Sequence, residues 1–146
     1  QLLGALKRFL RNENPCEKPL FKYDKTKDSW TLLEDASFDG QPFVPDIVGF
    51  LEGNESRVNG EVMKQRAKKL NANLGQHHAE YLLEHQDLIP KEWRGKFYLT
   101  FPGTVWQDRG GDRYVPYLYW FGGSWCLNFD WLGNDWNSNA RLVCLR

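Results

Sequence analysis

The chain has 146 residues, and its 19 lysines and arginines balance its 19 aspartates and glutamates, so the formal net charge is zero. A chain of this length can bury one core, which predicts a single domain over residues 1–146. Without net charge there is no field to attract nucleic acid or an anionic membrane, and no stretch approaches the roughly 18 apolar residues of a membrane span; we therefore expect a soluble protein with no nucleic-acid partner and no membrane insertion.

An amphipathic helix is predicted at the start of the chain, ending before Pro15. Its apolar residues recur at three- and four-residue steps: Leu2, Leu3, Leu6, Phe9 and Leu10. Core packing is the simplest role for this stripe, and self-association is the alternative.

Residues 20–23 and 29–33 then flank polar residues 24–28, which predicts a β-hairpin. Residues 38–60 are rich in Gly, Pro, Asn and Asp and predict a loop, with one short strand or turn near residues 47–51.

Two further helices are predicted before Pro90. Asn59 is the expected N-cap of the first, and Asn73 with Gln76 resembles a capping box at the start of the second. The first helix is predicted from Val62, Met63, Arg66, Ala67 and Leu70. The predicted buried stripe of the second is Leu74, His78, Tyr81, Leu82 and His85. A basic run near the first helix is expected to be its solvated face: Arg57, Lys64, Arg66, Lys68 and Lys69.

The hydrophobic period changes to two after Lys96, so residues 96–146 are predicted to form an aromatic-rich antiparallel β region. Glycine-rich turns at residues 108–112 and 122–123 separate the strands, and residues 141–145 form the last one. A meander is the expected topology, with Pro116 at an edge or bulge because it lacks a backbone N–H. The fold class is therefore α+β, with two helices packed on an irregular antiparallel sheet. The alternative is a helical N-terminal half on an unrelated antiparallel meander or small barrel.

The histidines and cysteines do not form a metal-binding pattern. His77, His78 and His85 lack the three- or four-residue step that places two ligands on adjacent turns of one helix. The cysteines lack zinc-like spacing, and their odd number cannot pair completely within the chain: Cys16, Cys126 and Cys144. We predict no metal site, and cysteine usage leaves the compartment open.

Carboxylates among the aromatic strands leave a catalytic alternative open. Asp130 and Asp135 could serve as the acid and base of a carbohydrate-active enzyme, with tryptophans as sugar platforms; without turnover the same surface would be a carbohydrate-binding module. Aspartates at turns, including Asp108 and Asp112, more commonly bind the backbone to close the turn. The sequence contains no nucleophile elbow, P-loop or dinucleotide fingerprint, and we predict no catalysis and no cofactor.

The residue types between Phe121 and Asn139 share a property of their codons. Apart from tryptophan, every residue type in this stretch has a codon that ends in a pyrimidine. The tryptophan codon contains no adenine, and Lys, Glu, Gln and Met do not occur after Gln107. This combination resembles the variable region of the target proteins of diversity-generating retroelements, in which template adenines are mutated and adenine-free codons persist. Residues 139–143 are similar to the closing strand of the C-type-lectin-like fold that these proteins use, although no calcium-ligand motif is present.

The resemblance implies a C-type-lectin-like binding protein whose rigid sheet displays variable side chains to a ligand. With period two, the displayed ligand-binding set would be Tyr119, Phe121, Ser124, Cys126, Asn128, Asp130, Gly133, Asn134 and Asn137. The supporting set would be Trp120, Trp125, Leu127, Phe129, Trp131 and Leu142. Aromatic rings with small polar residues between them are typical of adaptable paratopes, so the expected ligand is a macromolecule or a surface, most simply a protein. An interaction module without diversification is the remaining alternative.

Overall fold

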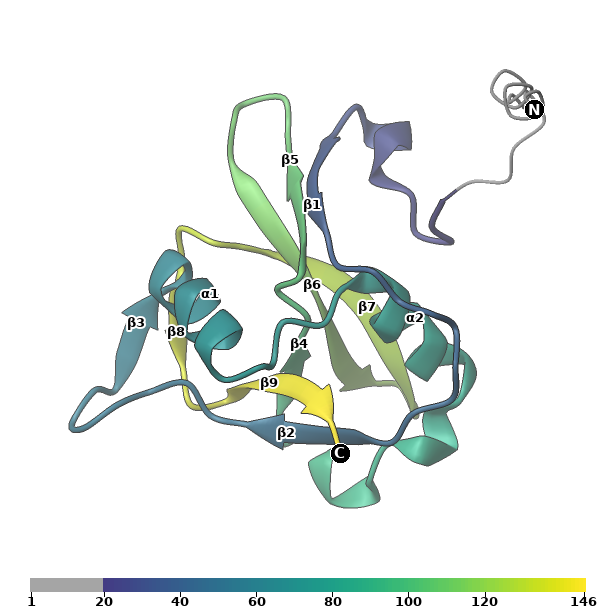
Figure 1. The fold of residues 1–146 in the computed structure, drawn as a ribbon, viewed down its shortest axis with the longest axis vertical. Helices are drawn as coiled ribbons and strands as arrows, with labels where there is room; N and C mark the ends of the chain where they lie inside the picture. Colours follow the sequence, from purple (N-terminus) through teal and green to yellow (C-terminus); the bar gives the residue numbers. More distant parts are fainter. Residues whose placement is uncertain (1–19) are drawn as a thin grey trace.

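The computed structural model describes residues 20–146, and the helix predicted near the start of the chain lies outside this part. The described residues form a curled mixed sheet with helices on it and a small second sheet beside it (Figure 1). The α+β class is therefore confirmed. The strands are β1 (Thr31–Asp35), β2 (Pro45–Val48), β3 (Arg57–Asn59), β4 (Tyr98–Thr100), β5 (Thr104–Gln107), β6 (Arg113–Phe121), β7 (Ser124–Trp131), β8 (Asp135–Asn137) and β9 (Ala140–Leu145).

Strand β6 is central to the main sheet, whose order is β1-β5-β6-β4-β9-β2 with β7 also on β6. β7 pairs along β6, so β5 and β4 share the other side of that strand. The predicted meander is correct where β4 and β7 each pair antiparallel with β6. It is wrong for the last strand, β9, which pairs with β2 and runs parallel to β4 instead of following β7. The small sheet pairs β3 with β8, and β3 lies in the segment predicted to be mainly loop.

Pro116 lies in this central strand, so the prediction of an edge position is wrong. Its carbonyl accepts a hydrogen bond from the Phe101 N–H at 3.0 Å. Phe101 follows β4, at the point where the neighbour of β6 changes from β5 to β4. In an antiparallel ladder the N–H and C=O of one residue point to the same side, so the N–H that proline lacks would face this change of partner rather than an intact strand.

Helix α1 (Gly60–Lys69) begins as predicted, with the Asn59 side chain accepting from the Glu61 N–H at 2.8 Å. Helix α2 (Gln76–Glu84) is capped differently from the prediction. Gly75 is its N-cap, and His78 Nδ1 accepts from the Gly75 N–H at 3.2 Å. The 3₁₀ turns are η1 (Lys25–Asp28), η2 (Gln86–Leu88) and η3 (Lys91–Trp93). No helix within residues 20–146 has the length and apolar character needed to cross a membrane.

The helices α1 and α2 cover opposite faces of the sheet. One core joins α1 to the sheet through Met63, Ala67, Val105, Val115 and Leu142. The other joins α2 to it through Ala79, Leu82, Leu99, Leu118 and Val143. Leu142 and Val143 are successive residues of β9 and therefore point to opposite faces. The predicted stripe of α2 is only partly correct, because His78 and Leu82 are buried whereas His85 is exposed.

The hairpin predicted for residues 20–33 does not form. The N–H groups of Lys22 and Tyr23 bind the Glu80 carboxylate of α2 at 3.0 and 2.9 Å. Phe21 is buried and stacks on His77, with a centroid distance of 4.3 Å. β1 pairs instead with β5. Residues 20–23 are therefore tied to α2 through side chains that the local sequence pattern does not reveal.

The basic run is not uniformly solvated as predicted. Lys64 is buried, and its ammonium lies 2.7 Å from Glu34 Oε1 and donates to the Pro102 carbonyl at 3.1 Å. Arg66 binds Glu55 at 2.6 Å. A buried charge is tolerated only when it is paired and hydrogen-bonded. Lys64 therefore links α1 to β1 and to the loop before β5.

Gly60 provides a direct test of the packing between α1 and the small sheet. A Cβ at this position would overlap the Leu132 carbonyl and lie 2.7 Å from Trp136 Nε1. We expect Gly60→Ala to lower the free energy of unfolding by about 1–3 kcal/mol through overpacking, although alanine is the better helix former. Gly49→Ala is the matched control, because a Cβ there meets nothing within 4 Å. Equal denaturant midpoints for the two variants would contradict the packing.

Candidate functional site

The β6–β7 hairpin places much of the predicted ligand-binding set on one face. Gly122 and Gly123, with φ of 63° and 86°, form its two-residue turn. The turn leads into a continuous register from Phe121 opposite Ser124 to Tyr114 opposite Trp131. Successive side chains alternate in direction, and the side chains that share this face are Tyr119, Phe121, Ser124, Cys126, Asn128 and Asp130. We call this surface the open face.

The predicted supporting side chains lie mostly on the opposite face, under α2. Trp125 is buried, and Trp120 and Leu127 pack against the same core. Phe129 is half-buried and contacts Trp30. Trp131 differs, since it is 42% exposed. Leu142 is buried in the other core, beside α1. Residues that pack in the core therefore lie mostly on one face of the hairpin, and accessible residues lie on the other.

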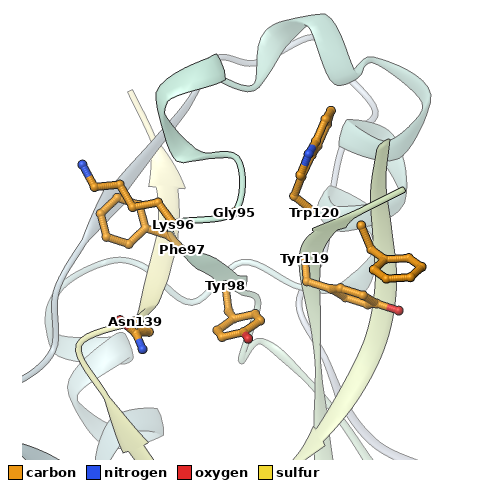
Figure 2. Close-up of a pocket in the computed structure, with 8 residues that line it drawn as sticks. Gly95, Lys96, Phe97, Tyr98, Tyr119, Trp120 and Asn139 are labelled. Atoms are coloured by element: carbon orange, nitrogen blue, oxygen red, sulfur yellow. The ribbon is translucent and has the colours of Figure 1, made fainter. Parts of the chain in front are cut away.

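Strand β4 adds an aromatic ring to the open face. Thr100 lies opposite Tyr117, so continuing the antiparallel register places Tyr98 beside Tyr119. The ring centroids are 5.9 Å apart for Tyr98 and Tyr117 and 5.7 Å for Tyr117 and Tyr119. Figure 2 shows Tyr98 and Tyr119 projecting to the same side of their strands, while Trp120 points to the other side. We call Tyr98, Tyr117 and Tyr119 the tyrosine row.

Two hollows flank the tyrosine row, and Tyr98 borders both. The first, of about 370 Å³, lies where β4 begins and β6 ends, and its lining includes Lys96, Phe121 and Asn139 (Figure 2). Phe121 is 71% exposed. The second hollow, of about 290 Å³, is lined by Tyr98, Thr100, Tyr117, Asp130, Trp136 and Ala140. The open face is therefore recessed on both sides of its tyrosines rather than flat.

Asp130 and Tyr117 give the second hollow its electrostatic character. Burial and then the nearby Asp130 carboxylate raise the pKa of Tyr117 above its ordinary value, so its phenol stays neutral at pH 7. Asp130 Oδ1 accepts from the Trp131 N–H at 2.8 Å and from Asn134 Nδ2 at 2.9 Å. No hydrogen bond within residues 20–146 uses its Oδ2 atom. The Thr100 hydroxyl is buried without a hydrogen-bond partner in the same part of the chain.

The remaining predicted site residues follow β7. Gly133 and Asn134 are exposed in the loop before β8, and Asn134 is held to Asp130. Asn137 is exposed in β8, and its side chain accepts from the Asn139 N–H at 2.9 Å. Of these three residues, Asn134 is therefore joined to the open face by a hydrogen bond.

Sequence reasoning omitted Tyr117 and Tyr98 from the site. Tyr117 has the same parity as Tyr119 in β6, so the period-two pattern alone could have included it. Tyr98 belongs to a separate strand, and its place beside β6 depends on pairing between distant segments. Asn139 likewise reaches the first hollow only because β9 lies next to β4.

Each of the three histidines considered as metal ligands has a ring nitrogen close to a polar group of the protein. Asp35 Oδ2 lies 3.3 Å from His77 Nε2, His78 closes the cap of α2, and His85 Nδ1 lies 2.9 Å from the Tyr81 carbonyl. Within residues 20–146, no group of three or more His, Cys, Asp or Glu side chains is arranged to hold a metal ion.

The aspartates considered for catalysis differ in position. Asp108 closes a turn, accepting from the N–H groups of Gly110 and Asp112 at 3.0 and 2.9 Å. Burial acts to raise the pKa of Asp108, but these hydrogen bonds and that of Tyr114 outweigh it and lower the pKa. Asp135 lies in β8 with Arg57 4.0 Å away, whereas Asp130 lines the open face. Asp130 and Asp135 therefore lie in different sheets, and each carboxylate has its own partner, Asn134 for Asp130 and Arg57 for Asp135.

No protein-family model matches this chain, and neither a curated protein nor a solved structure matches it. The residues and geometry of the open face therefore carry the functional argument alone.

The buried ring of His78 gives the fold a predicted pH dependence. Burial and, next, the adjacent His77 lower the pKa of His78 from 6.5 to about 4. The unfolded chain therefore takes up a proton at higher pH than the folded protein, and stability should fall as the pH decreases from about 6.5 to 4. His78→Gln keeps a side-chain acceptor for the Gly75 N–H without titrating there. Thermal unfolding between pH 7 and 4 should show a smaller loss for the variant, and parallel pH profiles would contradict this role.

Proposed function

We propose that this protein is a non-catalytic binding protein of the type that diversity-generating retroelements vary, built on a form of the C-type-lectin-like fold. One observation carries the proposal. Six side chains picked out by codon pattern and period share an accessible face, while Trp120, Trp125 and Leu127 of the same hairpin pack under α2. A surface of this kind tolerates substitution because its side chains contribute little to the core.

The chemistry of the open face favours a protein ligand. The tyrosine row and Phe121 offer rigid rings with accessible area, and Ser124, Asn128 and Asn134 offer short polar groups between and beside them. Tyrosine with Ser, Gly and Asn is the composition of antibody-like paratopes, where rings supply contact area and small groups supply adaptable hydrogen bonds. The hollows beside the row could receive side chains of the ligand, and the proposal requires no cofactor.

The direct test of diversification is the gene itself. Sequencing its 3′ end and flanking DNA across a source population should reveal variation confined to codons of the open face, including those for Tyr119, Asn128 and Asn134. The variable bases should correspond to adenines in a nearby near-copy, with a reverse transcriptase gene beside it. The tryptophan codons of the hairpin should be constant, because they contain no adenine. An invariant 3′ end with no near-copy would overturn the proposal.

A further inference from the structure

The second hollow combines aromatic side chains with one carboxylate. Tyr98, Tyr117 and Trp136 line it, and Asp130 is the one charged residue of its lining among the residues the structure describes. Aromatic faces carry the negative lobe of the ring quadrupole and attract cations within about 6 Å of the centroid. Asp130 adds a full negative charge, with Oδ2 outside the hydrogen bonds that hold Oδ1.

Nearby basic side chains are held over other rings. The guanidinium of Arg141 lies 4.3 Å from the centroid of Phe97, and that of Arg94 lies 4.2 Å from Trp120. Lys96 Nζ lies 5.6 Å from the Phe97 ring and borders the first hollow. None of these residues lines the second hollow. A cation entering there would therefore meet negative potential from the rings and the carboxylate.

The size of the hollow limits its occupant. At about 290 Å³ it lies just below the usual range of ligand pockets, roughly 300–1,000 Å³. It is suited to the end of one side chain rather than to a large cofactor. The half-buried Tyr117 ring and the buried Thr100 opposite it on β4 provide a partly desolvated site, where an interaction between a cation and a ring is stronger than at an exposed site.

We propose that the hollow formed by Tyr98, Tyr117 and Asp130 binds the cationic end of an arginine or lysine side chain of a protein ligand. This inference rests on the proposed function, because it assigns the chemistry of one contact on the open face. The cation packs against the tyrosine rings and pairs with Asp130 Oδ2. Since Asp130 belongs to the predicted variable set, its replacement would change which side chain the hollow accepts, while Tyr98 lies outside that set.

Matched small ligands test the preference for charge. The full chain, labelled with ¹⁵N, is titrated with N-acetyl-arginine amide, N-acetyl-lysine amide and N-acetyl-citrulline amide, and amide shifts are followed by NMR. Citrulline has nearly the shape of arginine but is neutral. We expect saturable shifts at the second hollow with at least one cationic ligand, and affinity about tenfold weaker for citrulline than for arginine if arginine binds. Added salt should weaken the binding of the cation.

Substitutions locate the site. Asp130→Asn keeps the Oδ1 acceptor for Asn134 but removes the charge, and should weaken cation binding several-fold. Asp135→Asn, at an exposed carboxylate of β8, is its control and should have no effect. Tyr98→Leu should also weaken binding, whereas Tyr23→Leu, at another exposed tyrosine, should not. Equal binding of arginine, lysine and citrulline, shifts elsewhere in the protein, no saturable shifts, or an unchanged affinity in Asp130→Asn would overturn the inference.

The inference and the proposed function fail in distinguishable ways. A charge-selective hollow in a protein whose gene is invariant would support the cation site and overturn diversification. A diversified gene with no charge selectivity at Asp130 would leave the binding surface and overturn the cation site.

Discussion

The register of the β6–β7 hairpin is the constraint on which the rest of the structure depends. It is set at the turn, where Gly122 and Gly123 adopt positive φ. A slip of one residue would exchange the two faces of a strand. Trp125 and Leu127 would then be exposed, and Asn128 and Asp130 would be forced under α2. The burial of large apolar residues against that helix therefore stabilises the one register that leaves the tyrosines accessible.

The same central strand joins the packed and accessible parts of the molecule. Leu118 of β6 is buried under α2, while Tyr117 beside it contributes to the open face. α1 and its core cover the Val115 end of this face and leave the tyrosine row uncovered. The hollows follow from this incomplete cover. A rigid surface with recesses between its rings can bind a ligand without ordering a loop, which reduces the entropic cost of association.

Local patterns were sufficient for the hairpin and insufficient for its surroundings. Period two and the paired glycines predict β6, β7 and the parity of their side chains, and Asn59 identifies the start of α1. The positions of Tyr98 and Lys64 depend on contacts between distant segments: β4 lies between β6 and β9, and Lys64 pairs with Glu34. The hairpin predicted for residues 20–33 does not form for the same reason, because the Glu80 carboxylate of α2 accepts hydrogen bonds from the N–H groups of Lys22 and Tyr23.

The central claim is that the open face can change without loss of the fold, and chemical denaturation tests it most directly. The double variant Phe121→Ser/Asn128→Ser alters two exposed residues of this face, and Leu118→Ala alters a fully buried residue of the same hairpin. We predict that the double variant changes the free energy of unfolding by less than about 1 kcal/mol, whereas Leu118→Ala lowers it by about 2–5 kcal/mol. A loss in the double variant as large as that of Leu118→Ala would contradict the account.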